Sequence, residues 1–342
     1  MVKNGVSPLL LWDYSVVSPF ECAIPRLSQL TEHEPTYDPC VDGFDAKNEL
    51  SGRSVRNLDR STALLLTSVR DLDIQMARRA MKSEDIGVVV GTSFGSVSTT
   101  IRFTQDGLTG DRPYLVNPAK FPNTVMNFAA GQVAIWHGLR GPNATLIAGV
   151  GSLFAAMRYG GRLLRSQQAS ALVIGASEES SSERNRIESC SGGADVIAEG
   201  AVSFLITDRD VTIDDAAPIA EIYCFRPVHA SFTDGHLAGA IASWTIQARA
   251  QLEGSDPSQI VVIADSKTAG ACRSALGAIG DSGEVPPVAE LRLDRYSFGA
   301  WSGGIALAAV LKQLKNGQSA LLVAADPLHN AVVPLLVRAP AI

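Results

Sequence analysis

The chain has 342 residues, of which 46% are hydrophobic and 19% charged, so a large core can form and a disordered chain is excluded. At roughly 150 residues per domain, this length predicts about two domains, or two halves of one. The formal net charge of −6, with no basic run, argues against nucleic acid as the main partner.

The amino-terminal segment has no pattern of a secretory or membrane-spanning sequence. Its apolar run, Leu9 to Trp12, is interrupted by Asp13 and is too short to cross a bilayer. The five cysteines are scattered and form no C-x-x-C pair, which predicts neither a disulfide framework nor a zinc site. We therefore expect a cytoplasmic chain without membrane contact or bound metal.

The first 80 residues give no clear secondary-structure pattern. From residue 86 onward, apolar runs alternate regularly with turn residues such as glycine. A helix is expected over 152–165, where Leu153, Met157 and Leu164 recur at helical spacing. The Ser180–Ser182 run with its neighbouring glutamates indicates a solvated loop. Buried strands are expected at the apolar runs 86–91, 145–148, 171–176 and 201–206.

The second half of the chain follows the same order of elements. Ala171 and Ala320 lie 149 residues apart, and each is the first residue of an apolar run that follows an amphipathic helix. Two copies of one such unit predict a duplicated α/β architecture. The expected strands are 219–225, 260–264, 320–325 and 332–337, and the expected helices are 236–252 and 305–314.

Several motifs together resemble the β-ketoacyl synthases of the thiolase superfamily. They are the segment FPNTVMNFAAGQ at 121–132, the glycine-containing turn at 91–95, the Glu-Gly-Ala turn at 199–201 and the helix start at 299–306. The resemblance implies a duplicated, five-layered α/β/α/β/α fold. It divides the chain into an amino-terminal half, residues 1–208, and a shortened carboxy-terminal half, residues 209–342.

The resemblance also implies a catalytic cysteine at a helix N-terminus and two histidines, and all three residues are replaced here. Val150, or at most Gly149, stands at the cysteine position, Asp265 at the first histidine and Ala300 at the second. None of these side chains supplies a thiolate or an imidazole. We therefore expect no catalytic residue of the family's type and no cofactor, and whether the chain is an enzyme by itself stays open.

A ketosynthase-like chain without these residues is similar to a chain-length factor, the non-catalytic subunit of a type II polyketide synthase. The resemblance implies two partners, an active ketosynthase in a heterodimer and an acyl carrier protein. Val125 matches the position that protrudes into the partner's acyl tunnel, and a valine there predicts a long, linear product such as a polyene. The expected tunnel and interface residues are Phe121, Thr124, Val125, Met126 and Phe128.

Two alternative functions remain open. The fold could serve an acyltransferase or hydrolase that uses Ser152 or Asp265, although the sequence around Ser152 lacks the G-x-S-x-G spacing of a nucleophile elbow. Alternatively, the chain could be a structural pseudo-enzyme that stabilises a synthase without shaping its product.

Overall fold

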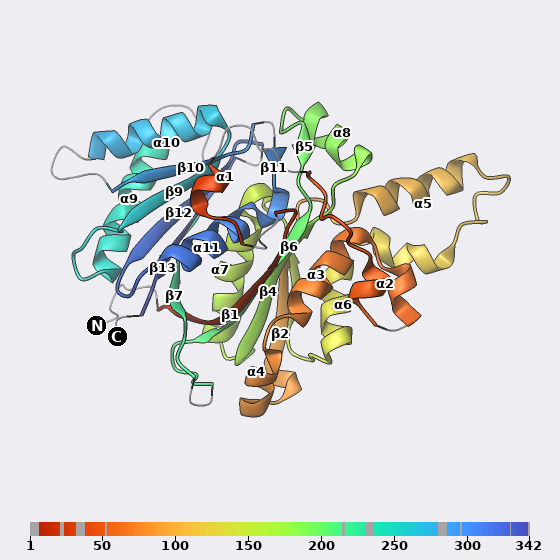
Figure 1. Cartoon of the computed structure of the whole chain (residues 1–342), viewed down its shortest axis with the longest axis horizontal. Helices are drawn as coiled ribbons and strands as arrows, with labels where there is room; N and C mark the ends of the chain where they lie inside the picture. Colours follow the sequence, from red (N-terminus) through yellow and green to blue (C-terminus); the bar gives the residue numbers. More distant parts are fainter. Residues whose placement is uncertain are drawn as a thin grey trace.

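The computed structural model describes residues 7–20, 24–31, 38–51, 53–213, 216–229, 236–279, 286–294, 296–328 and 330–340. Its centre is an eleven-stranded mixed sheet, ordered β10-β9-β12-β13-β7-β1-β6-β4-β2-β3, with β8 (Val228–His229) paired to β13 (Figure 1). The amino-terminal strands are β1 (Leu9–Val17), β2 (Ile86–Gly91), β3 (Asn143–Leu146), β4 (Ala171–Glu178) and β6 (Gly200–Asp208). The others are β7 (Ala220–Cys224), β9 (Gln259–Ala264), β10 (Val288–Arg292), β12 (Ser319–Asp326) and β13 (Ala331–Arg338).

The two ends of this sheet repeat one topology. In the first, β2 runs parallel to β3 and β4, whereas β6 is antiparallel to β4 and β1. In the second, β9 runs parallel to β10 and β12, whereas β13 is antiparallel to β12 and β7. The pairing of β1 with β7 joins the two sets. The boundary expected after residue 208 falls between β6 and β7, and its status as a domain boundary stays a prediction.

Helices cover both faces of each set of strands and make five layers. The central layer holds α7 (Ser152–Arg165) and α11 (Ser302–Gln313), whose apolar residues share one core with inward residues of both sets of strands. On one outer face α3 (Arg60–Arg70) and α6 (Phe128–His137) build a second core, and on the other α9 (His236–Gln251) and α10 (Ser266–Ile279) build a third. The predicted α/β/α/β/α fold is confirmed.

Strand alternation explains why this sheet can carry a core on each face. Along β12, Leu322 packs into the central core, whereas Leu321 and Val323 pack into the outer one. The expected helices and strands after residue 86 are present, with one shift. The strand expected at 145–148 is β3 at Asn143–Leu146, because Ile147 and Ala148 already leave the sheet toward the turn before α7.

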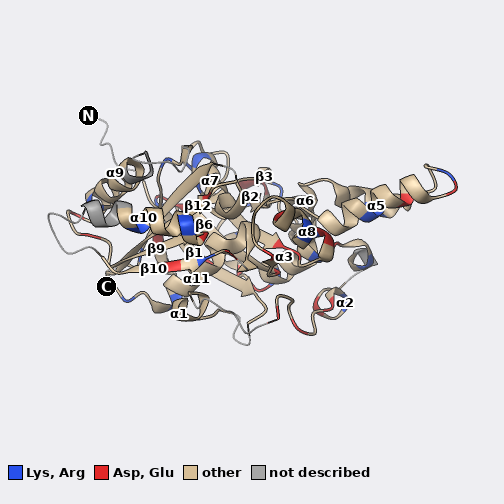
Figure 2. Cartoon of the chain, turned by 90° about the horizontal axis from the view of Figure 1, so that it is seen from above, with Lys and Arg blue, Asp and Glu red and all other residues tan. Residues whose placement is uncertain are grey.

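The remaining helices are short or lie at the margin. They are α1 (Leu27–Leu30), α2 (Ala46–Glu49), α4 (Ile74–Ala80), α5 (Val97–Thr109) and α8 (Ser182–Cys190). Helix α5 projects away from the layers as an arm, as both ribbon views show, and only its first residue is buried (Figures 1 and 2). No helix among the described residues has the length and apolar character needed to cross a membrane.

His137, at the end of α6, makes the fold sensitive to acid. Burial, with a smaller contribution from the nearby Arg78 charge, lowers the pKa of His137 from 6.5 to about 4. The folded protein therefore favours the neutral imidazole of His137. This contribution to stability is present above about pH 6.5, the pKa in the unfolded chain, and is lost as the pH falls toward 4.

We expect His137→Gln to make the pH dependence of stability shallower. Between about pH 7.5 and about pH 5, the wild-type free energy of unfolding should fall by about 2 kcal/mol more than that of the variant. Urea denaturation at the two pH values measures this difference. Parallel pH profiles for the two proteins would show that His137 does not titrate with folding.

Candidate functional site

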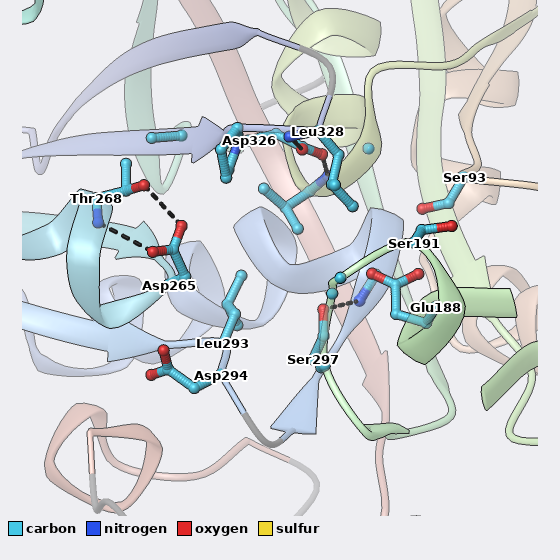
Figure 3. Close-up of a pocket in the computed structure, with 18 of the residues that line it drawn as sticks. Ser93, Glu188, Ser191, Asp265, Thr268, Leu293, Asp294, Ser297, Asp326 and Leu328 are labelled. Carbon is cyan, nitrogen blue, oxygen red and sulfur yellow. Dashed lines mark hydrogen bonds between the residues drawn. The ribbon is translucent and has the colours of Figure 1, made fainter. Parts of the chain in front are cut away.

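A cavity of about 1010 Å³ opens where the amino-terminal and carboxy-terminal strands meet the central helices. Its walls come from the turn before α7, both ends of α8, the start of α10, the end of β12 and the residues after it, together with Leu293, Asp294, Ser297 and Gly299 (Figure 3). These segments are distant in sequence. The duplicated fold brings them together because both central helices begin at this end of the molecule.

Val150 lies in the 3-10 turn η4 (Gly149–Gly151) that leads into α7, and it lines the cavity. Gly149 has a φ of +52°, a conformation that glycine adopts without strain. The Val150 N–H donates to Asp326 Oδ2 at 3.1 Å, and the Leu328 N–H donates to Asp326 Oδ1 at 3.0 Å. The backbone N–H of Val150 is therefore already hydrogen-bonded to a carboxylate of the same chain.

Asp265 also lines the cavity, but both of its oxygens hold the start of α10. Oδ1 accepts from the Thr268 N–H at 3.0 Å and Oδ2 from the Thr268 hydroxyl at 2.6 Å (Figure 3). Asp294 similarly accepts from the backbone and hydroxyl of Ser266. These carboxylates act as helix caps, which is a structural use of the acid groups.

Ala300 is fully buried in the 3-10 turn η6 (Gly299–Trp301) before α11, and its neighbour Gly299 lines the cavity. The structure thus places Val150, Asp265 and the Ala300 turn around one space. Among the described lining residues there is neither a cysteine nor a histidine. His329, next to the lining residue Leu328, lies outside the described residues.

Ser152, the other nucleophile that the sequence offers, does not line the cavity. It is fully buried at the first turn of α7, where its hydroxyl donates to the carbonyl oxygens of Gly149 and Thr92 and accepts from the Ala148 N–H. This hydroxyl holds the turn together and has no exposed face toward the cavity.

The sequence analysis missed an ion network in one wall of the cavity, where Arg184 and Glu188 are lining residues. Glu178 Oε1 accepts from the N–H groups of Ser93 at 3.0 Å and Ala300 at 3.1 Å, so it ties both halves of the chain together. Arg184, 1% exposed, lies 3.5 Å from Glu178 and 2.6 Å from Glu188. Its guanidinium also lies over the Phe94 ring.

The prediction of a solvated loop with exposed glutamates near 180 is therefore wrong for those glutamates. Glu178 and Glu179 are both buried, and Ser181 caps α8. Charged side chains are normally exposed, and only the partners that the tertiary fold brings here make their burial tolerable. The sequence feature that could have indicated this burial is the pair of adjacent glutamates at the end of an apolar strand.

The expected tunnel residues lie in the 3-10 turn η3 (Pro118–Thr124), in the link that follows it and at the start of α6, and Met126 lies close to Gly95, the residue after the cavity-lining Phe94. Phe121 is 57% exposed, Val125 45% and Met126 44%, while Thr124 and Phe128 are half-buried. Large exposed apolar side chains continue on both sides of this segment. We name the whole set the apolar edge: Leu108, Tyr114, Leu115, Phe121, Val125, Met126, Ile135 and Ile147.

Ile147 of the apolar edge directly follows β3, the last strand of the sheet, which pairs only with β2 among the described residues. Its free side presents unpaired backbone groups, a template on which another chain can dock. Acidic and basic residues are interspersed over the rest of the molecule without a run of one sign (Figure 2). The described residues contain no group of three or more His, Cys, Asp or Glu placed to hold a metal ion.

Comparison with known proteins decides the family. The model of the β-ketoacyl synthase N-terminal domain matches residues 27–200, more than half of the chain. The chain belongs to the β-ketoacyl synthase family. Curated relatives in this family include two 3-oxoacyl-[acyl-carrier-protein] synthases 2. The one from Vibrio cholerae is 26% identical over 41% of this chain and 34% of its own length, and the one from Coxiella burnetii is 25% identical over 52% and 40%.

The matched part thus spans about a third to two fifths of these β-ketoacyl synthases. Solved structures match nearly the whole chain. The ishigamide ketosynthase/chain length factor has a TM-score of 0.77 at 24% identity, and covers 98% of this chain and 100% of its own. A type II polyketide synthase acyl-carrier protein in complex with its ketosynthase has a TM-score of 0.72 at 14% identity, with the same coverage. At these identities the solved structures establish the fold.

Proposed function

We propose that this chain is the non-catalytic chain-length factor of a heterodimeric type II polyketide synthase. The observation that carries the proposal is the turn before α7. Val150 stands where the family places its nucleophile, and the Asp326 carboxylate occupies the Val150 N–H. A thioester that entered this cavity would meet the alkyl side chain of Val150, which has no nucleophilic atom, and the Asp326 carboxylate, whose two oxygens are engaged by backbone N–H groups.

The apolar edge supports a pairing role. Its eight large side chains are exposed in the single chain, and one of them, Ile147, directly follows β3, whose outer side is unpaired among the described residues. Exposed apolar sets of this kind mark interaction surfaces, and obligate interfaces resemble a protein core cut in half. The partner is a ketosynthase that retains its cysteine and both histidines, and an acyl carrier protein delivers the acyl units.

The position of Val125 supports a limit on acyl-chain length. It protrudes from the apolar edge between Thr124 and Met126, where a docked partner would cover it. Side-chain bulk at such a position closes the far end of the partner's acyl tunnel. The small valine leaves room for a long, linear polyketide, and the proposed product is a polyene.

An acyltransferase or hydrolase function has weaker support. Ser152 is buried and holds its own turn, and both oxygens of Asp265 are engaged by Thr268. A purely structural pseudo-enzyme remains the second candidate. Both candidates explain a cavity without the family's catalytic residues. They differ in one expectation: in a structural companion, substitutions in the tunnel segment would alter the yield of polyketide but not its length.

The proposed function is tested by acylation of the co-purified pair. The chain is co-expressed with a ketosynthase that retains its cysteine and both histidines and co-purifies with it. The pair is treated with an acyl thioester, and each subunit is analysed by intact mass and peptide mapping. We expect the acyl adduct on the partner's cysteine and none near Val150. Cys190 is exposed, so a Cys190→Ser variant serves as the control for adventitious thiol labelling. A stable adduct in the α7 turn, or product formation by this chain alone, would overturn the proposal.

A further inference from the structure

A small second cavity lies directly behind the expected tunnel segment. One side is formed by Val125, Met126 and Phe128, and the other by polar residues of the first half. The space measures about 10 Å³, which accommodates one water-sized group. The polar lining residues are Asp59, Ser61, Thr62, Thr92, Ser96, Asn123 and Ser177.

Two polar atoms of this lining have no hydrogen-bond partner among the described residues. They are Ser96 Oγ and Asn123 Oδ1, and their residues are only 7% and 4% exposed. The Asn123 Nδ2 donates to the Asn57 carbonyl oxygen, which fixes the orientation of the amide. Asn123 therefore presents an acceptor that needs a donor, while the Ser96 hydroxyl can donate or accept.

Asp59 and Thr92, two of the neighbouring polar residues, already hold hydrogen bonds to other groups. The Asp59 carboxylate accepts from Ser61 Oγ and from both the backbone and the hydroxyl of Thr62. Thr92 Oγ1 accepts from the Gly95 N–H. Buried polar atoms without partners are rare and costly, so a group that enters this cavity with a donor is favoured over one without.

We propose that the cavity receives the leading end of the polyketide and selects an end that carries a hydrogen-bond donor, a hydroxyl or an amide N–H. The inference rests on the proposed function, because that function brings the acyl chain to Val125. The acyl chain passes the apolar side chains of Val125 and Met126, and its terminal donor replaces one water and bonds Asn123 Oδ1. A methyl end would leave both Ser96 and Asn123 without partners.

The test compares two primers of equal length on the reconstituted pair, one ending in a hydroxyl and one in a methyl group. Each is loaded onto the partner's cysteine, and the rate of extension is measured at limiting primer. We expect the hydroxyl-ended primer to be extended about tenfold faster, the effect of one neutral hydrogen bond. Ser96→Ala and Asn123→Leu should each reduce this preference several-fold.

Asn123→Leu also loses the hydrogen bond to Asn57 and could fail to fold. Ser96→Ala removes only a hydroxyl without a partner among the described residues, so the test then rests on that variant. Ser243→Ala, on the exposed face of α9, is the matched control and should keep the full preference. Equal extension of both primers by the wild-type pair would show that the cavity holds only a water, and would overturn this inference. If Val125→Phe still shortened the product in the same preparation, the proposed function would survive that result.

Discussion

Val125→Phe is expected to shorten the polyketide made by the assembled pair. The phenyl ring is larger than the isopropyl group it replaces, and extra bulk in a packed space costs about 1–3 kcal/mol. That free energy favours release over further elongation by roughly 5-fold to 150-fold for each extension that must pass the ring. Mass spectrometry of the released products should show loss of the longest species and accumulation of shorter ones.

Two further variants make this result specific. Val125→Ala should retain the longest product, because it removes bulk. Ile246→Phe adds a ring at an exposed position of α9, far from the apolar edge, and should leave the product distribution unchanged. If Val125→Phe lowered the yield but not the length, the chain would be a structural companion, and Val125 would not limit the tunnel.

Glu178→Leu is expected to cost about 3–5 kcal/mol in the free energy of unfolding, the largest stability effect we foresee. The substitution leaves Arg184 buried with only Glu188 as a counter-charge, and it removes the acceptor of the Ser93 and Ala300 N–H groups. Thermal and urea unfolding of the co-purified pair measure the loss. Glu178→Gln keeps an acceptor for the two N–H groups and should cost less.

The matched control for this prediction is Glu183→Leu. Glu183 lies on the solvent side of α8 and faces Arg102 at 3.6 Å, where the Arg102 side chain is 65% exposed. Exposed pairs of this kind contribute about 1 kcal/mol or less. Equal losses for the two leucine variants would show that the Glu178 network does not hold the two halves together.

The fold after residue 86 could be predicted because its signals are local. Apolar runs specify β2, β4, β9 and β12, and helical spacing specifies α7. Strand β1 was missed because its apolar pattern is broken at Asp13. There the strand has a bulge in its pairing with β6, and the Asp13 carboxylate accepts from the Asp73 and Tyr14 N–H groups.

The candidate site was only partly accessible from sequence. The placement of Val150, Asp265 and Gly299 around one cavity follows from the duplicated fold and the family resemblance. The Asp326 contact with the Val150 N–H could not be foreseen, because it joins residues far apart in sequence through one side-chain rotamer. Buried charge pairs such as Glu178 and Arg184 give the same composition signal as a hydrated loop.

The position of β1 in the sheet also constrains how the molecule is made. Leu9 pairs with Asp208 on one side and with Ile222 on the other. Strand β1 is synthesised well before both of its neighbours, β6 and β7, and lacks its sheet partners until both have been made. Such long-range closure slows folding and exposes unpaired strand edges meanwhile, so nascent chains of this protein should depend on chaperone protection during translation.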